Sequence, residues 1–187
     1  MRRAGRPARS VLLLAPFLLV AGPAAAEVTH RSPQGFATSE SVEVGVAPSE
    51  AWAVLVHPEL WWNPDHSWGG DAAAFRLDQY AGGCFCEDLP DGGSVEHLRV
   101  VFVQPYKTLR MKGALGPLQG EALDGTLTVE LAETPTGGTR ISWEYVVAGF
   151  ARYDLAAIAD PVDRVQDEQL RRLAALLSTG SPEPEAR

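Results

Sequence analysis

Basic residues are scarce in this sequence. Its 187 residues include 16 lysines and arginines against 24 aspartates and glutamates, for a formal net charge of −8. Four of the arginines lie before residue 27, so the rest of the chain has 12 basic residues against 24 acidic ones. This balance argues against nucleic acid or an anionic lipid surface as the main partner, because both attract proteins through positive charge.

No apolar run is long enough to span a bilayer, which takes about 20 residues in a helix. The longest covers residues 11–20, follows four arginines, and precedes Ala24-Ala25-Ala26, small residues typical of a cleavage site. Residues 1–26 are therefore predicted to be a signal peptide. The chain is expected to be exported to the periplasm or the medium, without stable membrane insertion after cleavage. A retained membrane anchor is the alternative.

Cysteine is nearly absent, with only Cys84 and Cys86. An exported chain with two cysteines usually forms a disulfide. In a regular strand, however, residues two apart are separated by about 6.6 Å, near the outer limit for a bridge. The spacing therefore favours free thiols, with a disulfide as the alternative.

Metal-binding motifs are also missing. The Cys-x-Cys pair stands alone, and the histidines that could join it, His57, His66 and His97, are scattered along the chain. Structural zinc sites normally combine wider Cys pairs with nearby ligands. His97 alternates with Arg99 and opposes Leu98, which predicts an outward position on a strand. No metal and no cofactor are expected.

The most prominent predicted element is a long amphipathic helix over residues 160–178. Asp160 is a good N-cap and Pro161 suits the first helical position. Helical periodicity then places one apolar stripe along the helix. The stripe contains Val162, Val165, Leu173, Leu176 and Leu177.

Two glutamines interrupt this apolar stripe. Gln166 and Gln169 lie on the side that should face a sheet. An amide left without partners in a dry core costs on the order of 1 to 3 kcal/mol. The two residues therefore predict a wet or ligand-lined space, whereas amides satisfied by sheet backbone or buried water are the alternative.

Almost everything before this helix has the pattern of strands. Residues 27–38 lack periodicity and are expected to be a flexible tether; residues 39–46 predict a first strand and residues 49–56 a short helix. Turn residues separate the later predicted strands at 74–79, 80–87, 95–103, 107–112, 126–131 and 139–147. The predicted class is α+β, a curved antiparallel sheet of about six or seven strands around the last helix. Residues 179–187 are expected to be a disordered tail.

Four stretches carry a resemblance to a known superfamily. They are VEVGVAPSEAWAVLVHPELWW, YAGGCFCE, VVFVQPYKTLRM and GTRISWEYVVAGF. The chain resembles the START-like (SRPBCC) superfamily over residues 39–178, which implies one domain with the helix-grip fold and an apolar cavity. That superfamily includes lipid and sterol carriers, polyketide cyclases and the activator domain of a heat-shock ATPase. No catalytic motif is shared across it, so none is carried over.

An aromatic loop follows the first predicted helix. Residues 57–70 hold three of the five tryptophans, Trp61, Trp62 and Trp68, together with His57 and His66. Large rings need burial, and loops carry function disproportionately. The loop is expected either to form a pocket wall or to plug one end of the sheet.

These features predict a protein that binds a small hydrophobic or amphipathic molecule between the sheet and the last helix. One alternative is a cyclase- or hydrolase-like enzyme in the same cavity; without a Gly-x-Ser-x-Gly motif, it would use a proton carrier among Asp65, His66, Arg76, Tyr80 and Tyr145. Another is a module that binds an envelope protein through its sheet. The sequence does not determine the oligomeric state. The predicted ligand-binding residues are Trp61, Trp62, Trp68, His66, Trp143, Tyr145, Gln166 and Gln169.

Overall fold

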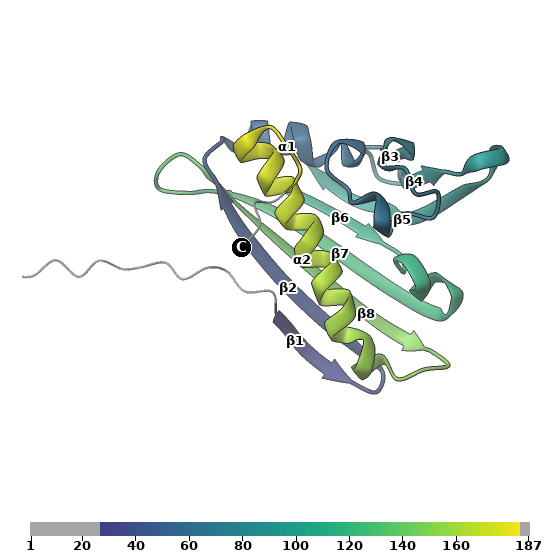
Figure 1. Cartoon of the computed structure of the whole chain (residues 1–187). Helices are drawn as coiled ribbons and strands as arrows, with labels where there is room; N and C mark the ends of the chain where they lie inside the picture. Colours follow the sequence, from purple (N-terminus) through teal and green to yellow (C-terminus); the bar gives the residue numbers. More distant parts are fainter. Residues whose placement is uncertain (1–26, 184–187) are drawn as a thin grey trace, which may run out of the picture.

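One open antiparallel sheet organises the protein (Figure 1). The computed structural model describes residues 27–183, so the predicted signal peptide and residues 184–187 of the predicted tail lie outside the described part. Eight strands follow the order β1-β2-β8-β7-β6-β5-β4-β3. They are β1 (Glu27–Ser32), β2 (Gly35–Val44), β3 (Phe75–Leu77), β4 (Cys84–Asp88), β5 (Ser94–Gln104), β6 (Thr108–Lys112), β7 (Ala122–Glu133) and β8 (Thr139–Phe150).

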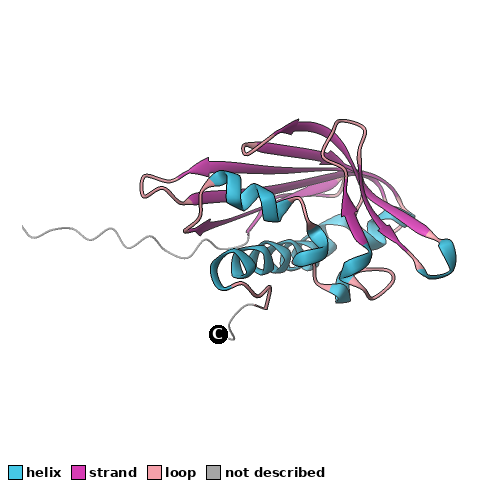
Figure 2. Cartoon of the chain, turned by 90° about the horizontal axis from the view of Figure 1, so that it is seen from above, coloured by secondary structure: helices cyan, strands magenta, loops and turns pink. Residues whose placement is uncertain are grey.

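Two α-helices, α1 (Pro48–Leu55) and α2 (Leu155–Thr179), cover the same face of this sheet (Figure 2). Short 3-10 turns complete the described chain: η1 (Pro58–Leu60), η2 (Pro64–His66), η3 (Ala72–Ala74), η4 (Pro90–Gly92) and η5 (Gly116–Gly120). The predicted α+β arrangement, with a long C-terminal helix across an antiparallel sheet, is confirmed. The sheet has eight strands rather than six or seven.

The additional strand comes from the predicted tether. Residues 27–38 form β1 and the first part of β2 instead of a flexible segment. Phe36 and Ala37 are both buried, because α2 covers one side of β2 while β1 and β8 flank it. Burial of successive residues removes the alternation by which a strand is recognised from sequence.

Helix α2 begins earlier than predicted. The cap is Asp154, whose Oδ1 accepts a hydrogen bond from the Ala156 N–H at 2.9 Å, and Pro161 lies inside the helix. A proline there removes one backbone hydrogen bond, which usually ends or kinks a helix. The affected carbonyl belongs to Ala157, an exposed residue that water can reach. Burial of Leu155 and Ala159 explains why the added turns form.

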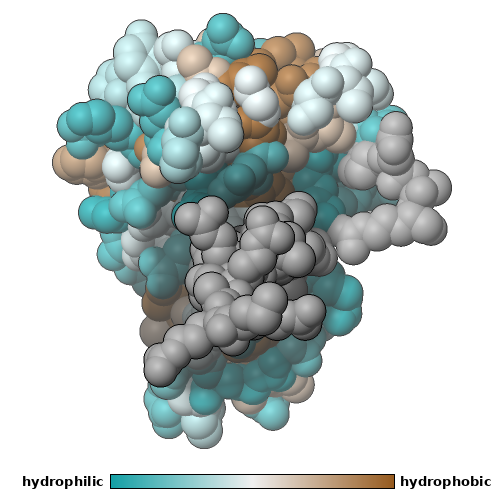
Figure 3. All heavy atoms as spheres, turned by 90° about the vertical axis from the view of Figure 1, so that its left-hand side faces the viewer, coloured by the Kyte–Doolittle hydropathy of each residue, from teal (hydrophilic) through white to brown (hydrophobic). Residues whose placement is uncertain are grey.

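The core lies between the sheet and its two helices. Its fully buried aliphatic side chains come from β5, β7, β8 and α2, and include Leu98, Val129, Ile141, Leu170 and Leu173. On the side of the molecule seen in Figure 3, hydrophilic residues cover most of the described surface around a hydrophobic patch. Within residues 27–183, no helix combines the length and apolar character needed to cross a membrane.

Cys84 and Cys86 form a disulfide, so the prediction of free thiols was wrong. The register between β4 and β5 shifts between Phe85 and Cys86, and the two cysteine Cα atoms lie 5.4 Å apart. This Cα separation is shorter than the regular two-residue spacing of a strand and lies in the range of ordinary disulfides. Both sulfurs lie near the Glu96 carboxylate, but as partners in a disulfide they have no thiolate to offer a metal.

Candidate ligand-binding site

A cavity of about 550 Å³ opens beside the first half of α2. Its walls come from the aromatic loop after α1, from β5, from the η5 segment and from α2. The lining residues are Trp62, Asp65, His66, Ser67, Trp68, His97, Leu115, Gly116, Pro117, Leu118, Tyr153, Ile158, Pro161, Val162, Val165 and Gln166. Small-molecule sites typically measure about 300 to 1,000 Å³, so the cavity has the right size for one small organic molecule.

Apolar side chains dominate this cavity. Ile158, Val162 and Val165 project from α2, and Leu115 and Leu118 come from the segment around η5. Val162 and Val165 belong to the apolar stripe predicted from sequence, but both are only half-buried because the stripe faces the cavity rather than a filled core. The wall contributed by residues 115–118 had no recognisable signal in the sequence.

The aromatic loop contributes two tryptophans to this cavity, Trp62 and Trp68. Trp62 is buried against Phe75 and Phe85, and its indole N–H donates to the His66 carbonyl at 3.0 Å. Trp68 remains 55% exposed. The loop is therefore both a packed element and a cavity wall.

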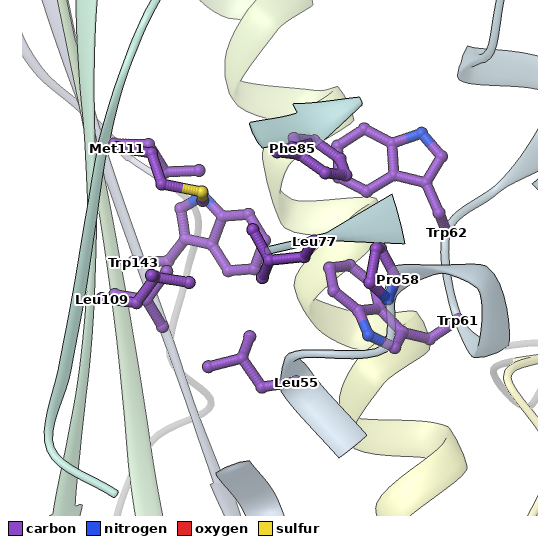
Figure 4. Close-up of a pocket in the computed structure, with 11 residues that line it drawn as sticks. Leu55, Pro58, Trp61, Trp62, Leu77, Phe85, Leu109, Met111 and Trp143 are labelled. Atoms are coloured by element: carbon purple, nitrogen blue, oxygen red, sulfur yellow. The ribbon is translucent and has the colours of Figure 1, made fainter. Parts of the chain in front are cut away.

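Trp61 and Trp143 do not line this cavity. They pack against each other edge-on, with ring centroids 5.9 Å apart, and both border a separate gap of about 20 Å³ that Trp62 also borders. In Figure 4, Trp61 and Trp62 approach this gap from the loop side, and Leu109, Met111 and Trp143 approach it from the sheet. A gap of this size and apolar lining has no room for an organic ligand. Both residues act as core packing.

Gln166 lies between the core and the cavity. Its Oε1 accepts a hydrogen bond from the Trp143 indole N–H at 2.7 Å, and the residue lines the cavity. Its Nε2 makes no hydrogen bond to a described residue and remains accessible to solvent. The amide therefore keeps a donor that a ligand in the cavity can meet.

Gln169 instead helps to attach the aromatic loop to α2. It is completely buried, and its Oε1 accepts a hydrogen bond from the Asn63 backbone N–H at 2.9 Å. Its Nε2 is buried without a partner among the described residues, and it does not line the cavity. Nearby, the Arg172 Nε donates to the Trp61 carbonyl at 2.9 Å. These contacts attach the aromatic loop to α2.

Replacing Gln169 with leucine is expected to lower the free energy of unfolding by about 1 kcal/mol or more, because the partly buried Asn63 N–H loses its acceptor. Removal of the unpartnered Nε2 offsets part of the cost. Urea unfolding measures the change, and Gln119→Leu is the control, since Gln119 makes only an exposed hydrogen bond to the Glu96 carbonyl. Unchanged stability with weaker ligand binding would instead place Gln169 in the cavity wall.

Tyr145 is also structural. It is fully buried. Its hydroxyl donates a hydrogen bond to the Gly113 carbonyl at 3.1 Å and accepts one from the Leu115 N–H at 3.0 Å. Gly125 permits this packing, because a Cβ there would lie 2.7 Å from the tyrosine hydroxyl. Burial raises the pKa of Tyr145 above its ordinary value, so the phenol stays neutral. Tyr145 holds the start of the η5 wall without reaching the cavity.

Two of the other predicted proton carriers line the cavity and two do not. Asp65 and His66 belong to the lining, and the His66 Nε2 lies 3.0 Å from the Glu168 carboxylate. Arg76 pairs with Asp88 on the surface, and Tyr80 is 62% exposed. Neither contributes to the cavity.

A buried histidine that the sequence placed on the outer face also lines the cavity. His97 is only 3% exposed, and its Nε2 lies 3.0 Å from the Glu87 Oε2. The prediction failed because β5 has a bulge there: Phe85 pairs with Leu98 while Cys86 pairs with Glu96. The extra residue turns His97 to the inner side with Leu98, which interrupts the two-residue alternation.

Glu87, completely buried, accepts hydrogen bonds from three N–H groups. Its Oε2 accepts from the Trp68 backbone N–H at 3.0 Å and from His97, and its Oε1 accepts from the Gly69 N–H at 2.5 Å. Burial lowers the pKa of His97, although the contact with Glu87 partly opposes this effect. The pair therefore combines a buried carboxyl acceptor with an imidazole whose pKa is lowered by burial, at the cavity edge.

Comparison with known proteins gives a likeness in fold only. No family model matches the sequence, and no curated protein matches it. Among solved structures, a conserved protein of unknown function from Enterococcus faecalis has a TM-score of 0.57 at 13% identity, with 88% of this chain and 82% of that chain covered.

Two further solved structures show the same likeness in fold. CalU16 from Micromonospora echinospora has a TM-score of 0.56 at 15% identity, covering 87% of this chain and 88% of its own. DynU16, a protein in the dynemicin biosynthetic locus, has a TM-score of 0.53 at 18% identity, covering 77% of this chain and 48% of its own. At these identities the likeness establishes the arrangement of sheet and helix.

Proposed function

We propose that this protein binds one small apolar or amphipathic molecule in the cavity beside α2. The observation that carries the proposal is a space of about 550 Å³ whose walls are mostly aliphatic and aromatic. An apolar molecule gains by leaving water for such a surface, at roughly 25 cal/mol per Å² buried. The START-like superfamily, with its helix-grip fold and internal cavity, is the structural class that this arrangement resembles.

The polar groups at the cavity suggest an amphipathic ligand. Gln166 offers an amide donor, while His66 and His97 offer imidazole nitrogens. Only a few such groups interrupt the apolar lining, which is the usual composition of a site where polar contacts fix orientation and apolar contacts supply affinity. The likeness to DynU16, from a biosynthetic locus, supports a natural product or a precursor as the ligand class.

Export remains part of the proposal. The sequence of residues 1–26 supports it, and the Cys84–Cys86 disulfide suits an oxidising compartment. Protein recovered from the cell envelope should have the intact mass of a chain that begins at Glu27. A full-length chain confined to the cytoplasm would contradict export.

A fluorescence titration tests the binding proposal. N-phenyl-1-naphthylamine is an uncharged apolar dye whose emission rises when it leaves water. We expect saturable binding of one dye per chain, with quenching of tryptophan emission because Trp62 and Trp68 border the cavity. Trp68→Ala should reduce the quenching. A response that does not saturate would contradict the proposal.

A further inference from the structure

Glu87 and His97 form a buried pair beside the cavity, and His97 lines it. His97 comes from β5 and Glu87 from β4, and both lie on the inner side of the sheet. His97 stacks on Phe75, with ring centroids 5.0 Å apart, and lies 5.3 Å from the ring of Phe85. Aromatic packing and the carboxylate together fix the orientation of the imidazole.

The hydrogen bonds assign the proton on this imidazole. Both Glu87 oxygens already accept backbone N–H groups, from Trp68 and Gly69, which assigns the carboxyl group as the acceptor and the His97 Nε2 that faces it as the donor. In a neutral ring the Nδ1 is then an acceptor with a free lone pair. This Nδ1 has no hydrogen-bond partner among the described residues, and it remains accessible to solvent. Because His97 lines the cavity, the lone pair is accessible from there.

We propose that His97 is a catalytic base for the molecule bound in the cavity, and that Glu87 is the residue that positions it. This inference rests on the proposed binding function and extends it from binding to catalysis. The substrate class is an apolar molecule with a carbon acid next to a carbonyl group, or with a phenolic or enolic hydroxyl.

The proton transfer requires no further reactant. The substrate C–H or O–H bond breaks, its proton bonds to the His97 Nδ1, and the electron pair remains on the substrate as an enolate or a phenolate. The imidazolium, stabilised by the Glu87 carboxylate, then returns the proton to the product or to water. Gln166 lines the same cavity, and its free amide donor suits a developing anionic oxygen.

The other titratable groups around the cavity differ from this pair. Asp65, Tyr153 and His66 line the cavity, and His66 faces Glu168. The His66 and Glu168 side chains are 32% and 40% exposed, whereas those of His97 and Glu87 are 3% and 0% exposed. A base shielded from water and held by a carboxylate is better prepared for proton abstraction than a solvated one.

The test uses 5-nitro-1,2-benzisoxazole, a small planar apolar compound. A base takes its C3 proton, the ring N–O bond breaks, a nitrile forms, and the coloured 2-cyano-4-nitrophenolate is released. We expect the wild-type protein to catalyse this reaction about 100-fold faster than His97→Gln, in the usual range for a positioned general base. N-phenyl-1-naphthylamine should inhibit it competitively.

Two further variants separate catalysis from folding. His57→Gln is the matched control, because His57 is 53% exposed, pairs with Glu59 at 2.9 Å and lies outside the cavity lining; its rate should equal that of wild type. Glu87→Gln should lower kcat about tenfold without raising KM. The wild-type rate should rise with pH to a plateau, with a midpoint below the ordinary histidine value, because burial lowers the pKa of His97.

Equal rates for wild type and His97→Gln would overturn the proposal, and so would a loss of rate that accompanies unfolding of His97→Gln with no decrease in folded Glu87→Gln. If the naphthylamine dye still binds in either case, the binding function survives. If the dye does not bind either, both proposals fail.

Discussion

Glu40→Gln is expected to stabilise the protein strongly at alkaline pH and hardly at all near pH 4.5. Glu40 is 2% exposed, belongs to β2 with its carboxyl group near Asp163 of α2, and has no hydrogen-bond partner for either carboxyl oxygen among the described residues. Burial raises its pKa to about 8, and the nearby Asp163 carboxylate adds to the effect. Burial also raises the pKa of Asp163.

The sign of this pH dependence follows from the number of protons that Glu40 binds in the folded and the unfolded state. Folded Glu40 has a pKa of about 8 and the unfolded residue about 4.5, so the folded state retains a proton that the unfolded state has lost. The stability from this residue is fully present below about pH 4.5 and is lost as pH rises through 8. Glutamine mimics the protonated acid. Since one pKa unit corresponds to about 1.4 kcal/mol, the gain at pH 9 should be on the order of 3 to 5 kcal/mol.

Urea unfolding between pH 4.5 and pH 9 measures this effect. Glu43→Gln is the control, because Glu43 is exposed on the same strand and pairs only with Arg140 at the surface; its effect should stay below about 1 kcal/mol. Parallel pH curves for wild type and Glu40→Gln would show that Glu40 is ionised in the folded protein, contrary to this account.

The double substitution of tryptophan for Val162 and Val165 is expected to weaken ligand binding at least 100-fold, about 2.7 kcal/mol. Both side chains line the cavity from one face of α2, so two indoles there occupy the space that the ligand needs. The fold should persist, because the added rings enter a cavity rather than a packed core.

Ala157→Trp with Arg164→Trp provides the matched control. These residues lie on the exposed side of the same helix and do not line the cavity. The control should bind N-phenyl-1-naphthylamine like wild type, and both double variants should keep the helical circular dichroism signal. Equal loss of affinity in both would mean that surface aromatics, and not cavity filling, change the binding.

The sequence predicted those elements in which buried and exposed residues follow a regular period. Strands β7 and β8 alternate between the core and the outer side, so Leu127, Val129 and Ile141 marked them correctly. The periodicity of α2 predicted the apolar stripe that contains Val162 and Val165, and the two glutamines within it predicted a space beside the helix. The aromatic loop was expected either to form a pocket wall or to plug one end of the sheet; Trp62 and Trp68 line the cavity, whereas Trp61 does not.

Irregular backbone accounts for most of what the sequence could not predict. The bulge in β5 turns His97 inward, which is not visible in a two-residue alternation. The Cα atoms of Cys84 and Cys86 lie 5.4 Å apart, closer than the regular strand spacing on which the prediction of free thiols rested. The wall at residues 115–118 depends on a distant hydroxyl, that of Tyr145. Gln166 and Gln169 have similar positions in the sequence pattern, but only the packing of the aromatic loop distinguishes a cavity residue from an anchor.

Contacts between a bound ligand and the cavity methyl groups test the central claim most directly. In an isotope-filtered NMR experiment, unlabelled N-phenyl-1-naphthylamine bound to methyl-labelled protein should give nuclear Overhauser effects to Ile158, Val162 and Val165, which line the cavity. Val101 and Val146, exposed on other parts of the sheet, should give none. Effects only to those two valines, or to neither set, would contradict a ligand site beside α2.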